Sequence, residues 1–149
     1  LMVYPSHYYA GFQVAADPKR NLPPLYYPYQ STNIADVAPN RPYDVVHRSL
    51  LIAGDVLAGR ATSTPTGPAA SGIATTTPQH MPVPMQKTAK LRPWLQDFDL
   101  SVDTARGIHY DAKKVRAQID AAEDAGASGW LLWSPTNIYT KEALRPARP

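Results

Sequence analysis

Short apolar runs alternate with amphipathic stretches along this chain. The apolar runs occupy residues 1–4, 91–96 and 129–133, and their length is typical of buried strands. Between them, residues 40–59 and 111–125 repeat apolar positions at helical spacing. The order is strand, helix, strand, helix, strand, and it contains no hairpin signal. We therefore predict an α/β fold in which the strands are parallel neighbours in one sheet.

The ends of both predicted helices carry suitable residues. Asn40 and Asp111 can accept a hydrogen bond as N-caps, and Pro42 suits a first turn. Gly59 and Gly126 can end the helices in a left-handed conformation. Each helix has one apolar stripe, which predicts packing on a sheet. The stripe residues are Val46, Leu50, Ala53 and Leu57 in the first helix and Val115, Ile119 and Ala122 in the second.

Proline interrupts the pattern in two segments. The chain has 16 prolines in 149 residues, more than regular structure tolerates, and most lie between these elements. Residues 11–39 mix proline with tyrosine and are interpreted as a long surface loop. Residues 61–88 lack aromatic residues and almost all charge, so we predict a disordered insertion. The hypothesis is one partial domain over residues 1–149 that contains this insertion.

Charge and composition exclude several classes of function. The net charge of +3 comes from scattered residues, without the Lys and Arg stripe of a nucleic-acid-binding protein. The absence of cysteine excludes disulfides and thiolate chemistry. No apolar run is long enough to span a membrane, and the four histidines lack metal-binding spacing. We therefore expect neither a metal nor another cofactor. The oligomeric state is left open.

Two features suggest a piece of a larger sheet. The chain opens within a strand-like run, and a three-stranded sheet is small for independent stability. The expectation is that the chain is the C-terminal part of something longer.

Four sequence blocks resemble one known family. They are VYPSHY at residues 3–8, PYDVVHRSL at 42–50, LRPWLQDF at 91–98 and VRAQIDAAEDAGASGWLLWSPTNIYTKEAL at 115–144. In this order they resemble the C-terminal part of the putative glycosyl hydrolase domain family, and the two proline-rich segments depart from its pattern. The resemblance implies an eight-stranded (β/α) barrel distantly related to α-amylase-type glycosidases. The three strands would be its sixth, seventh and eighth, and the protein would act in the cell envelope or outside the cell.

Asp97 is the leading catalytic candidate. It ends the second apolar run, and barrel enzymes keep their chemistry at the C-terminal ends of the strands. Glycosidases need paired carboxylates about 5 to 9.5 Å apart across the bond they break. Asp97 is therefore predicted to be catalytic or to contact the substrate; the alternative is that it braces its loop. Asp99 is interpreted as an ordinary loop acid.

Aromatic and polar side chains near the strand ends are the predicted sugar contacts. Aromatic faces pack on the C–H faces of sugars, and polar groups bond their hydroxyls. On strand alternation Trp94 shares a face with Arg92 and Gln96, which predicts that all three point into the barrel. The predicted substrate-binding residues are Tyr4, His7, Tyr8, Trp94, Gln96, Trp133 and Asn137.

Three functions remain open at this point. The first is a glycoside hydrolase acting on a polysaccharide. In that case the isolated chain should be inactive, because its general acid and nucleophile would come from strands outside it. The second is a non-catalytic carbohydrate-binding barrel of the cell envelope. The third is an interaction segment that works through the proline- and tyrosine-rich loop.

Overall fold

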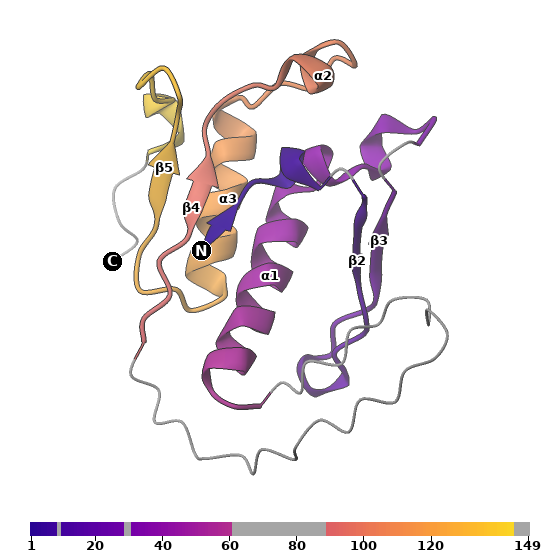
Figure 1. Ribbon diagram of the computed structural model, residues 1–149, viewed down its shortest axis with the longest axis vertical. Coiled ribbons are helices and arrows are strands. Elements are labelled where there is room, and N and C mark those ends of the chain that lie inside the picture. Colours follow the sequence, from indigo (N-terminus) through magenta and orange to yellow (C-terminus); the bar gives the residue numbers. More distant parts are fainter. Residues whose placement is uncertain (9, 29–30, 61–88, 145–149) are drawn as a thin grey trace, which may run out of the picture.

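The computed structural model describes residues 1–8, 10–28, 31–60 and 89–144. The predicted disordered insertion at residues 61–88 lies outside the described residues. Three parallel strands form one sheet in the order β1 (Met2–Val3), β4 (Trp94–Gln96) and β5 (Leu131–Trp133). Figure 1 shows this sheet with its helices. The prediction of an α/β fold with a parallel sheet is confirmed.

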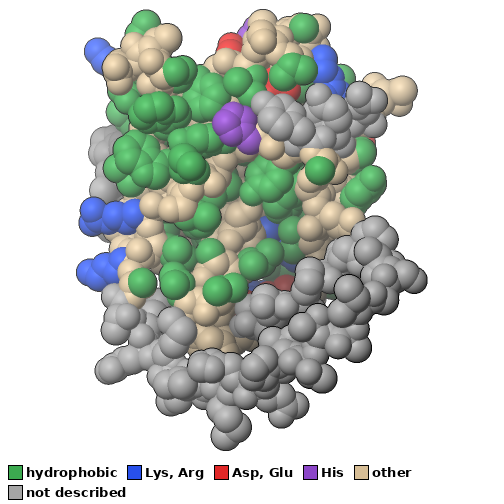
Figure 2. Space-filling model, in the orientation of Figure 1, with side chains coloured by type: hydrophobic (Ala, Val, Ile, Leu, Met, Phe, Trp, Pro, Cys, Tyr) green, Lys and Arg blue, Asp and Glu red, His purple; other side chains and the backbone are tan. Residues whose placement is uncertain are grey.

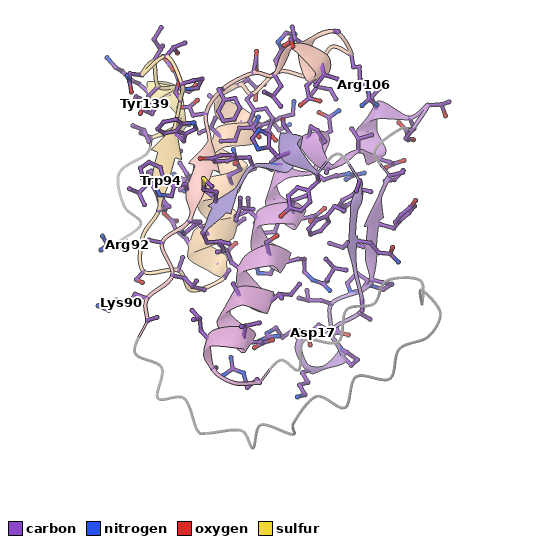
Figure 3. All side chains as sticks on the ribbon, in the orientation of Figure 1. Asp17, Lys90, Arg92, Trp94, Arg106 and Tyr139 are labelled. Atoms are coloured by element: carbon purple, nitrogen blue, oxygen red, sulfur yellow. The ribbon has the colours of Figure 1, made fainter. Side chains whose placement is uncertain are left out.

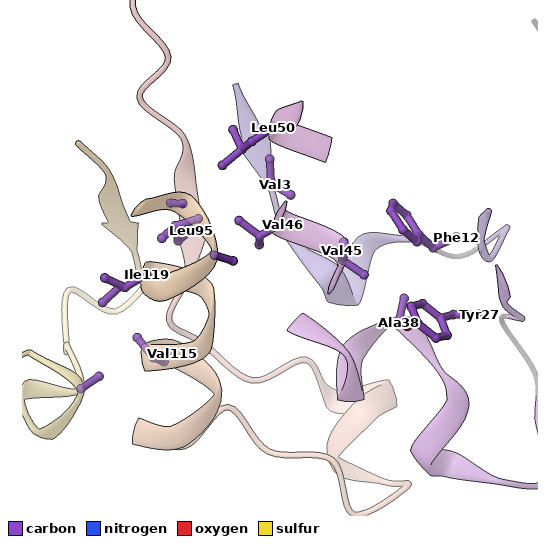
Figure 4. Close-up of a cluster of buried hydrophobic side chains, with 13 residues drawn as sticks. Val3, Phe12, Tyr27, Ala38, Val45, Val46, Leu50, Leu95, Val115 and Ile119 are labelled. Atoms are coloured by element: carbon purple, nitrogen blue, oxygen red, sulfur yellow. The ribbon is translucent and has the colours of Figure 1, made fainter. Parts of the chain in front are cut away.

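Two helices cover one face of the sheet. They are α1 (Pro42–Leu57) and α3 (Ala112–Asp124), which pack against each other, with α1 beside β1 and α3 behind β4 (Figure 1). Their apolar stripes meet the strand residues Val3 and Leu95 in a continuous core (Figure 4). The helical spacing and the strand alternation therefore identify the same buried layer. Its fully buried members include Val46, Leu50, Val115, Ile119 and Ala122.

The caps of α3 agree with the sequence, but the start of α1 does not. The Asp111 carboxylate accepts a hydrogen bond from the Lys114 amide at 2.9 Å. Asn40 was wrongly predicted as the N-cap of α1, because it lies in the preceding 3₁₀ turn, Ala38–Asn40, where its side-chain amide donates to the Ile34 carbonyl. Arg41 precedes α1 without a capping side-chain bond. Pro42 and the residues after it still form the predicted helix.

The proline- and tyrosine-rich segment contains a hairpin, so its interpretation as a loop was wrong there. Strands β2 (Phe12–Val14) and β3 (Leu25–Tyr27) pair antiparallel. A 3₁₀ turn at Pro18–Arg20 lies between them. From α1, the guanidinium of Arg48 donates to the carbonyl oxygens of Pro23, at 2.7 Å, and Ala15, at 2.5 Å. The hairpin is therefore fixed against α1 by main-chain contacts that side-chain patterns do not indicate.

Strand β5 is less buried than predicted. A buried strand was predicted there, but Leu131 and Leu132 are half-buried and Trp133 is exposed. The reason is that β5 is an edge strand of the described sheet and helices cover only one of its faces.

Candidate functional site

The C-terminal ends of the three parallel strands lie at one edge of the sheet. The segments leaving them are residues 5–8 after β1, residues 97–110 after β4 and residues 134–140 after β5, and we call these together the exit edge (Figure 1). The middle segment includes the short helix α2 (Ser101–Thr104). Three loops far apart in sequence thus come together where α/β enzymes place their active sites.

Asp97 lies at the centre of the exit edge and is 4% exposed. Its main-chain amide donates to the Trp133 carbonyl, which extends the pairing of β4 with β5. The side-chain hydroxyl of Thr140 donates to Oδ1 at 2.7 Å, and the Thr140 amide donates to Oδ2 at 2.9 Å. No Lys or Arg within the described residues forms an ion pair with this carboxylate. Asp97 is thus a buried acid held by neutral donors, with acceptor capacity left on both oxygens.

Gln96 is completely buried and bonds the first two exit segments together. Its side-chain oxygen accepts the Ser6 amide at 3.1 Å, and its Nε2 donates to the Ser6 hydroxyl at 2.7 Å and the Phe98 carbonyl at 2.9 Å. The side-chain amide of Gln118, on α3, bonds the main-chain N–H and C=O of Gln96 at 2.9 and 2.7 Å. Gln118 thereby supplies the two main-chain hydrogen bonds that a neighbouring strand would otherwise make with Gln96. In this arrangement Gln96 holds the loops and has no surface open to a sugar.

An aromatic group lies beside the exits of β1 and β4. The Tyr4 ring makes edge contacts with His7 at 5.3 Å and Phe98 at 5.5 Å between ring centroids. Burial raises the pKa of the Tyr4 phenol above its usual value, so it stays protonated. His7 is exposed next to this group. The structure therefore brings two predicted substrate-binding residues, Tyr4 and His7, together with a third aromatic residue.

The sheet face away from the helices is open and apolar. Trp94 and Trp133 lie on it in an edge-to-face pair, with ring centroids 6.0 Å apart, and they are 37% and 42% exposed. Figure 2 shows hydrophobic side chains gathered over β4 and β5, and Figure 3 shows Trp94 and Tyr139 on the same flank. Arg92 was predicted to point into the barrel. It lies outside β4, and its side chain is exposed rather than enclosed by other described residues.

Two further predicted contacts, Tyr8 and Asn137, lie in the first and last exit segments. The Tyr8 hydroxyl is 3.2 Å from the Ser49 hydroxyl of α1, and its ring packs edge-on against Phe12. Tyr8 therefore joins α1 to the hairpin. Asn137 is exposed and left-handed, with φ of 55°, in a turn that its amide closes onto the Ser134 carbonyl at 3.1 Å.

Asp99 and His109 close the base of the loop that follows β4. Asp99 Oδ2 is 3.1 Å from His109 Nδ1, and Oδ1 accepts the Tyr110 amide at 2.6 Å. Partial burial opposes ionisation of Asp99, but the Tyr110 amide and the His109 ring outweigh it and lower the pKa of the carboxyl below its usual range. We call Asp99, His109 and Tyr110 the loop neck.

A separate cavity lies away from the exit edge, between the hairpin and α1. Its volume is about 860 Å³, and its charged lining includes Arg20, Arg48 and Asp55. Arg20 pairs with Asp55 at 2.7 Å and also with Asp17. Much of the charge there is used in internal ion pairs, which indicates a structural role for this region.

Comparison with known families decides the class of protein. A family model described as a putative glycosyl hydrolase domain matches residues 1–139. The chain belongs to this family. The match assigns it, at family level, to the glycoside hydrolases, which implies a carbohydrate substrate. No curated protein and no solved structure matches the chain.

Two further properties of the described residues of this glycosyl hydrolase domain concern membranes and metals. None of the described helices has the length and apolar character needed to cross a membrane. The described part of the chain also contains no cluster of three His, Cys, Asp or Glu side chains that could hold a metal ion.

The sequence interpretation missed several residues that shape the exit edge of this domain. Thr140 precedes the last 3₁₀ turn, Lys141–Ala143, and its side chain bonds Asp97, 43 residues away. Gln118 gave a usable signal, since a polar residue beside the apolar stripe of a helix needs a buried partner. No signal in the sequence points to His109, because only the fold brings its side chain close to Asp99.

Proposed function

We propose that this chain forms part of a (β/α) barrel that hydrolyses glycosidic bonds in a polysaccharide at the exit edge. The observation that carries the proposal is Asp97, a buried carboxylate at the C-terminal end of the middle parallel strand with no cation paired to it in the described residues. Family membership supports the reaction class.

The open sheet face supports the barrel. Apolar side chains that gather on one exposed face usually mark a surface that something covers. In a closed barrel, strands from outside these residues would pair beyond β1 and β5, and the face with Trp94 and Trp133 would line the interior. The parallel order β1-β4-β5, with helices on the opposite face, is the arrangement such a barrel requires.

In the proposed mechanism, the Asp97 carboxylate stabilises positive charge on the substrate. Breaking a glycosidic bond develops positive charge on the sugar ring, and a fixed carboxylate stabilises it. The two donors of Thr140 fix the orientation of the Asp97 carboxylate and leave further lone pairs for substrate. The acid that protonates the leaving group would come from another strand of the complete enzyme.

The sugar would be held by side chains around Asp97. The Trp133 ring offers an exposed apolar surface, the buried Tyr4 ring packs against His7, and His7 and Asn137 offer polar groups on the first and last exit segments. Trp94, on the open face, would extend this surface toward the interior. Gln96 and Tyr8 are assigned supporting roles, because their polar atoms already bond Ser6 and Ser49.

The test is hydrolysis by the complete protein that contains this chain. It is incubated with a panel of neutral, acidic and amino-sugar polysaccharides, and new reducing ends are measured alongside binding. Release of reducing ends from at least one polysaccharide is expected. Binding without release would favour the non-catalytic carbohydrate-binding barrel, in which Asp97 is only a brace for Thr140. If the protein showed no binding and no release, the hydrolase proposal and the carbohydrate-binding alternative would both be contradicted.

A further inference from the structure

We propose that His109, oriented by Asp99, is a proton-transfer group of the exit edge. This inference rests on the proposed hydrolase function and adds a second chemical group to it. It differs from the sequence interpretation, which treated Asp99 as an ordinary loop acid.

The geometry of the loop neck fixes the imidazole. Asp99 Oδ2 lies 3.1 Å from His109 Nδ1, and the Asp99 side chain is itself held by the Tyr110 amide at 2.6 Å. The Lys114 ammonium donates to the His109 carbonyl at 2.8 Å, which holds the main chain at the same point. A carboxylate that accepts from Nδ1–H leaves Nε2 as the proton acceptor. Asp99 therefore selects the tautomer in which Nε2 carries the lone pair.

Accessibility separates this pair from Asp97. The side chains of His109 and Asp99 are 57% and 43% exposed, whereas Asp97 is 4% exposed and bonded through both oxygens. A group that exchanges protons with water or a sugar hydroxyl must reach solvent, and a group that only stabilises charge need not. The two acids that leave β4 are thus suited to different tasks.

The loop neck also adjoins the segment after β1. Burial raises the pKa of the Tyr110 phenol well above its usual value, and the nearby Ser6 hydroxyl partly offsets the rise. Ser6 in turn bonds Gln96, which immediately precedes Asp97. Tyr110, next to His109 in the chain, thus lies near Ser6, although its hydroxyl has no hydrogen-bond partner within the described residues.

The proposed step is a proton transfer with a defined balance. His109 Nε2 takes a proton from water as the water oxygen bonds to the anomeric carbon and the glycosidic C–O bond breaks. A protonated carboxyl group elsewhere in the complete enzyme gives its proton to the leaving oxygen. The imidazolium then releases its proton to solvent, and the carboxylate regains one. The charged groups in contact with His109 are Asp99, at the imidazole, and Lys114, at the main-chain carbonyl; the Tyr110 amide holds Asp99.

The experiment compares His109→Gln and Asp99→Asn in the complete protein, on a polysaccharide that the wild type hydrolyses. Loss of a general base is expected to lower kcat by about 10²- to 10⁴-fold. For His109→Gln we also expect loss of the ascending limb of the pH profile of kcat/KM, with little change in KM. Asp99→Asn should lower kcat less, because the imidazole remains. Nitrogen NMR of the wild type should find Nδ1 protonated and Nε2 unprotonated in the neutral ring.

Matched controls are available elsewhere in the chain. His47→Gln removes a histidine of α1, and Asp36→Asn removes an exposed carboxylate that pairs with Arg41; both should leave kcat unchanged. His109→Gln with wild-type kcat and pH profile, or the opposite tautomer in the NMR spectrum, would overturn this inference and leave the hydrolase proposal standing. A wild type that hydrolyses nothing would overturn both.

Discussion

The two faces of the parallel sheet carry apolar side chains in opposite surroundings. On the face toward α1 and α3, Val3 and Leu95 are completely buried in a closed core. On the other face Trp94 and Trp133 lie exposed, although their rings are larger and bury more surface when covered. Since β4 contributes to both faces, the difference arises from what covers each face and not from the strand itself.

This contrast separates folding from function within one strand. The covered face accounts for the stability of the α/β unit, because burial of apolar area is the main stabilising term. The open face and the exit edge contain the residues proposed for sugar binding, where exposure is required. Substitutions on the two faces should therefore change different measurements.

The largest effect on stability is expected from Leu95→Ala. Removing a fully buried leucine side chain from the core should lower the free energy of unfolding by about 2–5 kcal/mol. Trp94→Ala on the opposite face of the same strand should cost about 1 kcal/mol, mainly through its contact with Trp133. Denaturant unfolding of both variants measures the difference. Equal losses would show that the open face is packed as tightly as the core.

A somewhat smaller effect is expected from Gln118→Leu. This change leaves the main-chain N–H and C=O of Gln96 buried without partners, which should cost about 2–3 kcal/mol. The matched control is Gln13→Leu at an exposed position of the hairpin, with little expected change. Unfolding midpoints compare the two variants. A neutral Gln118→Leu would mean that another group replaces the lost hydrogen bonds.

Thr140→Val changes the exit edge and should lower the free energy of unfolding by about 1 kcal/mol. The variant keeps the main-chain donor to Asp97 Oδ2 but loses the hydroxyl donor to Oδ1. Thr140→Ser keeps both donors and serves as the control. In the complete protein we expect Thr140→Val to lower kcat and Thr140→Ser to retain it. A variant that lost stability but kept full turnover would limit Thr140 to a structural role.

The smallest effect concerns Asp55, near the C-terminal end of α1, which pairs with Arg20. The Arg20 guanidinium, aided by Arg60, lowers the pKa of Asp55 to about 2. Because the folded-state pKa lies below the unfolded value of about 3.9, this contribution is present above about pH 4 and is lost as the pH falls toward 2. Asp55→Asn should remove this pH dependence of the free energy of unfolding between about pH 4 and pH 2. The change should be less than about 1 kcal/mol, because the Arg20–Asp55 pair is partly exposed.

The sequence predicts the covered face better than the exit edge. Helical spacing identifies Val46, Leu50 and Ile119, because burial on one face imposes a period on neighbouring residues. The Asp97 to Thr140 contact joins residues with no shared period, and only the parallel pairing of β4 with β5 brings them together. The hairpin was missed for a related reason. Its connection is long and irregular, so it lacks the short turn that marks most hairpins.

The most direct test of the account is the turnover of Asp97→Asn in the complete protein. Asparagine keeps the size of the side chain but removes the negative charge proposed to stabilise the sugar. With a polysaccharide that the wild type hydrolyses, we predict that kcat falls at least about 100-fold. The free energy of unfolding should stay within about 2 kcal/mol of the wild-type value. Undiminished turnover by a folded Asp97→Asn variant would contradict the catalytic role of Asp97 and leave it as the brace of the last exit segment.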